Sequence, residues 1–71
     1  MEMFPVGSST LEAIGYGYPK RVLRVKFNSG RIYDYKDVEP DVFLAFLKAP
    51  SKGSYFDKSI RNCGYPFQRI S

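Results

Sequence analysis

The sequence contains no histidine, no tryptophan and a single cysteine, Cys63. Without a second cysteine the chain cannot close an internal disulfide, and without histidine it cannot form a Cys/His zinc site by itself. The same absences exclude Ser-His and Cys-His catalysis, in which histidine activates the nucleophile. A Gly-rich phosphate loop after a strand is missing too. We therefore predict no enzymatic activity and no cofactor.

Long hydrophobic segments are also missing. The longest apolar run, Val42 to Leu47, has six residues, whereas about 20 are needed to span a bilayer. The first residues carry neither the basic segment nor the apolar stretch of a signal peptide. We expect a cytoplasmic protein with no membrane contact, and a lone thiol is compatible with that reducing compartment.

The composition is that of one small globular domain. The 71 residues are 44% hydrophobic and 17% aromatic, and a chain of this size buries only about 60% of the surface that its unfolded form exposes. Pro5 and Gly7 interrupt the N-terminal residues, so we predict a loosely held arm over residues 1–7 and a single domain over residues 8–71.

Up to Val38 the hydrophobic pattern has a period of two, which is typical of an antiparallel sheet with one solvated face. Leu23 and Val25 fall on one face of a predicted strand, and Arg24 and Lys26 fall on the other. Flanking strands are predicted over residues 10–16 and 31–38, with turns at residues 17–20 and 28–30.

At Pro40 the period changes to 3.6, which predicts a helix. Proline suits the first helical position because its missing N–H would have no partner there. Glu39 and Asp41 complement the positive end of the helix dipole. The helix should end at Ala49-Pro50, since the residue before proline is disfavoured in the α region.

A second short helix is predicted to begin at Ser51, an N-cap residue whose hydroxyl can accept from a backbone N–H two or three residues later. Phe56, Ile60 and Cys63 are spaced to pack inward, and Gly64 is a suitable terminator. Residues 65–70 read as a closing extended segment.

These elements predict an α+β fold. We expect a small antiparallel sheet, a three-stranded meander plus the closing C-terminal strand, with two short helices packed on one face. An SH3-like small barrel is the structural alternative.

The net charge of +4 is unevenly distributed. Residues 1–47 hold six Lys and Arg and six Asp and Glu, whereas residues 48–71 hold five Lys and Arg and only one acid, Asp57. A local positive excess can attract a polyanion. A net charge of this size is also ordinary for a small soluble domain, so charge alone leaves both interpretations open.

Two features favour a nucleic acid. The start of the second helix offers backbone N–H groups, a glycine and a lysine, which together suit a phosphate. Rings alternate with cations further on, as in proteins that stack bases and neutralise phosphates. Tyr55 lies at the edge of the apolar arc and fits core or surface. The candidate nucleic-acid-binding residues are Ser51, Lys52, Gly53, Ser54, Tyr55, Lys58, Arg61, Tyr65 and Arg69.

Two other chemistries are set aside. Asp34, Asp37, Glu39 and Asp41 are close in sequence, but the glycine-containing loop with alternating ligands that holds a hard cation is absent. Interaction with the helix dipole and exposure of the strand to solvent explain why these carboxylates are present, so we predict no metal site. Cys63 is expected to be a small buried hydrophobe and not a nucleophile.

Several blocks of the sequence are distinctive: Ile14-Gly15-Tyr16, Tyr33-Asp34-Tyr35, and above all Ser51-Lys52-Gly53-Ser54-Tyr55-Phe56 followed by Ile60-Arg61 and Tyr65-Pro66-Phe67. From about Ser8 to Ile70 the chain resembles the KTSC domain, which occurs at the C-terminus of some lysyl-tRNA synthetases and as stand-alone proteins. The resemblance implies a nucleic-acid role, with RNA or tRNA as the expected ligand, and it does not extend to aminoacylation. By the same resemblance Ile60 is expected to serve packing.

Our first hypothesis is a non-enzymatic RNA-binding module, acting as a monomer or weak dimer. Lys52, Lys58, Arg61 and Arg69 would neutralise phosphates, and Tyr55 or Tyr65 would stack on a base. The alternative is a protein-interaction module that adds a partner strand at the sheet edge or docks an acidic partner on the same basic surface.

Overall fold

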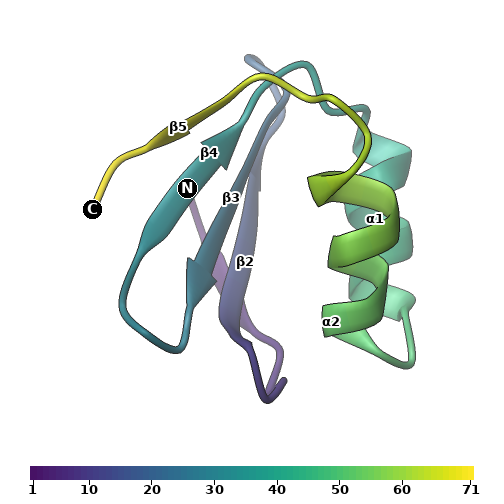
Figure 1. The fold of residues 1–71 in the computed structure, drawn as a ribbon. Coiled ribbons are helices and arrows are strands. Elements are labelled where there is room, and N and C mark those ends of the chain that lie inside the picture. Colours follow the sequence, from purple (N-terminus) through teal and green to yellow (C-terminus); the bar gives the residue numbers. More distant parts are fainter.

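A single antiparallel sheet covered on one face by helices makes up the computed structural model, which describes all residues from 1 to 71 (Figure 1). Its strands are β1 (Met3–Pro5), β2 (Leu11–Gly17), β3 (Val22–Phe27), β4 (Ile32–Tyr35) and β5 (Phe67–Arg69). Its helices are α1 (Pro40–Lys48), α2 (Lys52–Tyr55) and the π-helix η1 (Phe56–Arg61), which continues α2. The predicted α+β class is confirmed.

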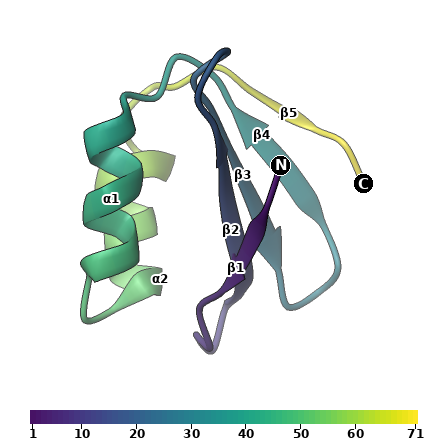
Figure 2. The same ribbon diagram turned by 180° about the vertical axis from the view of Figure 1, so that it is seen from behind.

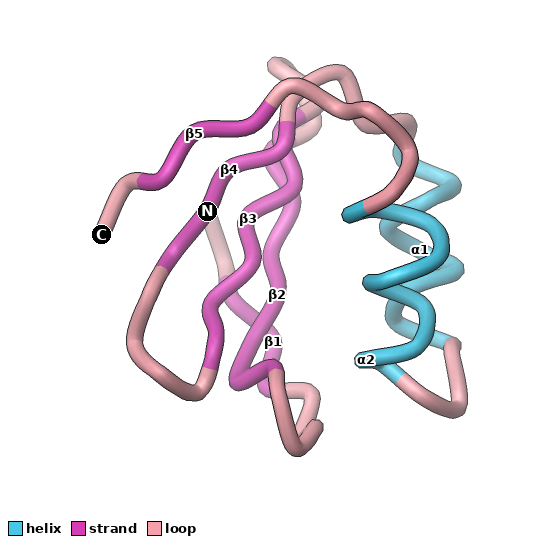
Figure 3. Tube along the Cα trace, viewed as in Figure 1, coloured by secondary structure: helices cyan, strands magenta, loops and turns pink.

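The strands follow one another in the order β1-β2-β3-β4-β5, and both helices are inserted between β4 and β5. Because β1 and β5 are edges, the sheet is open, and the alternative of an SH3-like barrel is wrong. The tube in Figure 3 shows both helical segments on the same side of the strands, with the chain crossing back over the top to reach β5.

The N-terminal residues contribute a fifth strand that the sequence did not predict. Met3 pairs with Gly15 and Pro5 pairs with Ala13, so β1 lies along β2 (Figure 2). A Cβ atom on Gly15 would lie 2.6 Å from the carbonyl oxygen of Glu2, so only glycine permits this close approach. The predicted loose arm over residues 1–7 is therefore wrong for residues 3–5.

The central strands agree with the predicted meander, although β4 ends early. Gly30 has a φ of 94° in the loop between β3 and β4, where glycine was expected. Asp37 has a φ of 60°, which takes the chain out of the extended conformation after Tyr35. The Tyr16 hydroxyl then donates to the carbonyl oxygen of Val38 and holds the start of the helical layer against β2.

Helix α1 has the predicted ends. Pro40 occupies the first helical turn, Asp41 adds an acid there, and Ala49 closes the helix in an extended conformation. The predicted ends of this helix are confirmed. They could be predicted because the signals are local in the sequence, with a proline at each boundary.

Ser51 caps the second helix as predicted, since its hydroxyl accepts from the backbone N–H of Ser54 at 3.3 Å. The helix then changes to the π form at Phe56, which bonds i to i+5 and rotates less per residue than an α-helix. Phe56 and Ile60 remain buried, but Cys63 lies beyond the end of η1 and is exposed. The prediction of a buried Cys63 is therefore wrong.

The hydrophobic core lies between the sheet and the helices. Its rings are in mutual contact, as with Tyr16 stacked on Phe43 at 5.3 Å. The core residues are Leu11, Ile14, Tyr16, Leu23, Val25, Tyr35, Val38, Phe43, Phe46, Phe56 and Ile60. Neither helical segment is long and apolar enough to cross a membrane.

Candidate nucleic-acid interface

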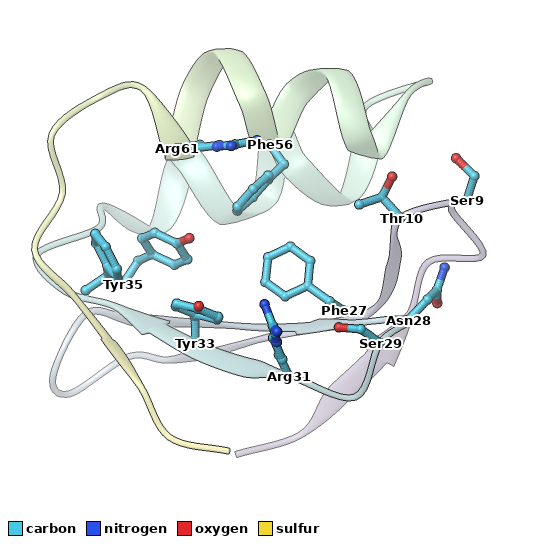
Figure 4. Close-up of a pocket in the computed structure, with 11 residues that line it drawn as sticks. Ser9, Thr10, Phe27, Asn28, Ser29, Arg31, Tyr33, Tyr35, Phe56 and Arg61 are labelled. Carbon is cyan, nitrogen blue, oxygen red and sulfur yellow. The ribbon is translucent and has the colours of Figure 1, made fainter.

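An open cleft of about 580 Å³ lies between η1 and the part of the sheet where β3 turns into β4 (Figure 4). We call it the aromatic cleft. Its lining combines rings, hydroxyl and amide groups and two arginines, in the residues Ser9, Thr10, Phe27, Asn28, Ser29, Arg31, Tyr33, Tyr35, Phe56, Arg61 and Phe67.

The alternation of the strands directs these side chains into the cleft. Tyr33 and Tyr35 are two apart on β4, and directly paired residues of neighbouring antiparallel strands share a face. Tyr35 pairs with Phe67 and Tyr33 pairs with Arg69 on β5. Arg69 is therefore on the same face of the sheet as the rings, although it does not line the aromatic cleft.

The rings of the cleft differ in burial. Phe56 and Tyr35 are buried in the core, whereas Phe67 is 62% exposed. The Phe67 ring lies 5.9 Å from that of Tyr33 and 5.6 Å from that of Tyr35, measured between centroids. Phe67 and the half-buried Tyr33 thus offer aromatic surface to a ligand while Phe56 and Tyr35 support them.

The cleft carries two arginines and no carboxylate. Arg61 comes from the helix side and Arg31 from the sheet side, with the labelled rings between them in Figure 4. Arg31 forms no ion pair, and Arg61 contacts Asp57 at 3.4 Å with both side chains more than half exposed. Such exposed pairs contribute little, so both guanidinium groups remain available to an anion.

Burial raises the pKa of Tyr35, and the neighbouring Tyr33 phenol raises it further. The positive charge of Arg61 acts in the opposite direction and lowers the pKa of Tyr35. The electrostatic influence of Arg61 therefore reaches the interior of the cleft.

The opposite face of the sheet is built differently. There the guanidinium of Arg24 makes two hydrogen bonds to Asp34, at 2.8 and 3.0 Å, and these bonds raise the pKa of Arg24. Lys26 pairs with Glu12 at 3.1 Å. These cations are neutralised by their neighbours and leave little charge for a ligand.

The structure divides the residues predicted as one nucleic-acid-binding patch. Only Arg61 lines the aromatic cleft. Ser51, Ser54, Tyr55 and Lys58 line a smaller hollow of about 260 Å³ beside the end of α1. Because the chain winds as a π-helix between them, Lys58 and Arg61 line different hollows although they are three residues apart.

Two of the predicted residues have structural roles. The Lys52 ammonium donates to the carbonyl oxygen of Ala49 and so closes the end of α1. The Tyr55 hydroxyl donates to the carbonyl oxygen of Val42 at 3.0 Å, and its ring packs 5.1 Å from that of Phe46. Burial raises the pKa of Tyr55. Tyr55 thus packs between the helices and has a structural role.

The remaining predicted residues are dispersed. Gly53 is near the hydroxyls of Ser8 and Thr10, at 3.8 and 4.0 Å from the position of a Cβ atom. Tyr65 is half-buried against the core, and Arg69 is exposed on β5.

The candidate residues chosen from the sequence omit a ring and an arginine that line the cleft, Phe67 and Arg31. A signal for Arg31 was present, because Arg31, Tyr33 and Tyr35 are each two apart and so share a face of the extended chain. For Phe67 the signal is its pairing with Tyr35, which only the fold reveals.

An open antiparallel sheet with one helical layer and a cationic cleft between them defines a small α+β domain with one candidate binding surface. The chain belongs to the KTSC domain family, whose model matches residues 7–65. Its fold is shared with the crystal structure of a KTSC domain protein from Yersinia pestis, with a TM-score of 0.90, 32% sequence identity and coverage of 99% of this chain and 97% of that one.

Two relatives show how the domain occurs. The chain is 36% identical over 70 residues to an uncharacterized protein of Stutzerimonas stutzeri, covering 99% of both chains. It is 33% identical over 63 residues to a lysine–tRNA ligase of Nostoc punctiforme, a match that spans 89% of this chain and 11% of the ligase.

Proposed function

We propose that this protein is a non-enzymatic RNA-binding module of the cytoplasm that binds through the aromatic cleft. The observation that carries the proposal is the combination of Arg31 and Arg61 with exposed rings and no carboxylate in one cleft. Guanidinium groups neutralise phosphates, and rings supply stacking surface that tolerates any base. Lys58 and Arg69 add positive charge outside the cleft.

The relationship to a lysine–tRNA ligase favours RNA over DNA as the ligand. A tRNA ligase handles RNA, and a domain joined to such an enzyme is well placed to add contacts to the same substrate.

A protein partner is the second candidate, and the open edge at β5 favours it. β5 is a three-residue edge strand that begins with the exposed Phe67, at 62% exposure, and is followed by Ile70 at 41% exposure. An edge of this kind can accept a partner strand through its unpaired backbone groups.

Fluorescence anisotropy with a labelled single-stranded RNA tests the first candidate. With about three phosphate contacts we expect the slope of log affinity against log salt to be about −2. The double variant Arg31→Glu/Arg61→Glu should bind roughly 100-fold more weakly, because each charge-assisted hydrogen bond contributes about 1.5 kcal/mol or more.

The matched control is Lys20→Glu/Lys36→Glu, which makes the same change in net charge at two exposed residues outside the cleft. An equal loss in both variants would reduce the proposal to a nonspecific charge effect. If a cell extract yields a partner whose capture survives nuclease treatment and the RNA does not bind, the protein-interaction candidate is favoured.

A further inference from the structure

The aromatic cleft contains three kinds of side chain, and their arrangement limits which ligand the cleft can bind. Hydroxyl and amide groups of Ser9, Thr10 and Asn28 lie at one end, as Figure 4 shows. The rings occupy the middle, and Arg61 and Arg31 lie on the helix side and the sheet side of them. A ligand that matches this arrangement has an anionic group, a flat apolar face and hydrogen-bonding edges.

A nucleotide has these three parts. A volume of about 580 Å³ falls within the range of about 300–1,000 Å³ that is typical of small-molecule sites. We infer that the aromatic cleft holds one unpaired nucleotide, with its base against Phe67 and Tyr33 and a phosphate at Arg31 or Arg61. This inference rests on the proposed RNA-binding function and specifies the form of RNA that is recognised.

The location of the rings excludes a paired base. Phe67 and Tyr33 line a cleft whose other wall is η1, so a base has to leave its stack to enter the cleft and contact both rings. Double-stranded RNA presents mainly phosphates and 2′-hydroxyl groups, whereas unpaired bases can turn outward and stack on side chains. The cleft therefore discriminates single strands, loops and ends from duplex RNA.

Phe67 is the ring that should bear most of the base contact. It is 62% exposed and is not among the buried core residues. Its nearest ring neighbours, Tyr33 and Tyr35, lie at 5.9 and 5.6 Å and fix its position. The exposed part of the ring is left for a ligand.

The first arm of the test compares a single-stranded RNA with a hairpin duplex of matched composition, in anisotropy at about 50 mM salt. We expect the single strand to bind at least tenfold more tightly. Phe67→Ala should weaken single-strand binding about 5- to 150-fold, the range measured for loss of one base-stacking ring. Tyr18→Ala is the matched control, because Tyr18 is 59% exposed and lies outside the cleft.

The second arm is an NMR titration of labelled protein with AMP, with UMP and with ribose 5-phosphate. The nucleotides should shift the signals of Phe67, Tyr33 and Arg61, and ribose 5-phosphate should shift only those of the arginines. Thermal unfolding of each variant shows that a loss of binding does not come from a loss of fold.

The outcomes separate this inference from the proposed function. Equal affinity for single strand and duplex, with no effect of Phe67→Ala, overturns the unpaired-nucleotide site while RNA binding stands. Nucleotide shifts in the cleft without binding of any RNA overturn the RNA function and leave a nucleotide site. Neither shifts nor RNA binding overturns both.

Discussion

On the outer face of the sheet Arg24 and Lys26 each have a carboxylate partner, whereas the aromatic cleft on the helix side holds Arg31 and Arg61 with no carboxylate in its lining. The two regions use alternate residues of the same strands. Arg24 and Asp34 neutralise one another across β3 and β4, while Tyr33, one residue before Asp34, turns toward the cleft.

This comparison distinguishes cations whose charge stabilises the fold from cations whose charge is available to a ligand. A half-buried bidentate pair such as Arg24–Asp34 contributes to stability and presents almost no net charge. An arginine without a partner contributes little to the fold and keeps its hydrogen-bond donors for an anion. Net charge along the sequence does not distinguish these cases, because it counts both kinds of cation alike.

The largest effect is expected where a ring of the cleft also belongs to the core. Phe56→Ala should lower the free energy of unfolding by about 3–5 kcal/mol, because Phe56 is only 4% exposed and its loss leaves a cavity. Phe67→Ala should cost no more than about 1 kcal/mol. Thermal unfolding followed by circular dichroism measures both, and equal losses would assign Phe67 to the core and remove it from the site.

A carboxylate added to the aromatic cleft, as a partner for its arginine, should weaken RNA binding. Ser29→Asp places a carboxylate in the cleft two residues from Arg31, in a turn that accepts aspartate. We expect RNA affinity to fall on the order of tenfold, since the new charge pairs with the arginine and repels phosphate. Ser29→Asn is the matched neutral control. Unchanged affinity in the aspartate variant would mean that phosphates do not approach this end of the cleft.

Local signals in the sequence were sufficient for much of the fold. Pro40 and Ser51 mark the helix starts through their own backbone and side-chain chemistry, so both positions were predicted correctly. β1 could not be predicted because its pairing depends on Gly15, ten or more residues away, where a missing Cβ admits the strand. Cys63 was misplaced because nothing in the sequence marks the change to a π-helix at Phe56.

The candidate site was harder to predict because it also depends on residues that are distant in the sequence. Arg61 was identified from its place in a basic segment, but its partners in the cleft come from the β3–β4 turn and from β5. The β3–β4 turn and β5 are far apart in the sequence. They come together only because the order of the strands places β5 beside β4. Grouping cations by their position along the chain therefore placed Lys58 with Arg61 and missed Arg31.

The reverse change frees an arginine on the outer face of the sheet. It tests whether an unpaired arginine without rings beside it is sufficient for RNA binding. Asp34→Asn leaves Arg24 without its partner, and we expect a loss of about 1 kcal/mol in the free energy of unfolding. RNA affinity should rise less than about twofold, within what one exposed charge contributes by nonspecific attraction. Arg24 pairs across the strands with Gly15 and Asp34, so no ring stands beside it. A tenfold gain in affinity would show that the rings are dispensable.

The smallest expected effect concerns alkaline pH. Burial raises the pKa of Tyr35 above its ordinary value of 10.0, so the folded state holds that proton more tightly than the unfolded state does. Its contribution to stability is complete below about pH 10 and is lost as the pH rises through the folded-state pKa. Tyr35→Phe removes this titration, and it costs little at neutral pH because the Tyr35 hydroxyl makes no hydrogen bond within the protein.

Thermal unfolding between pH 8 and about pH 11 measures this difference. The melting temperature of Tyr35→Phe should fall less steeply above about pH 10 than that of the unchanged protein, by a few degrees at most. Tyr18→Phe is the control for the loss of an exposed phenol outside the cleft. Because all three proteins keep every lysine, general alkaline unfolding cancels from the comparison. Identical profiles for all three would mean that the Tyr35 phenol ionises in the cleft as freely as in water.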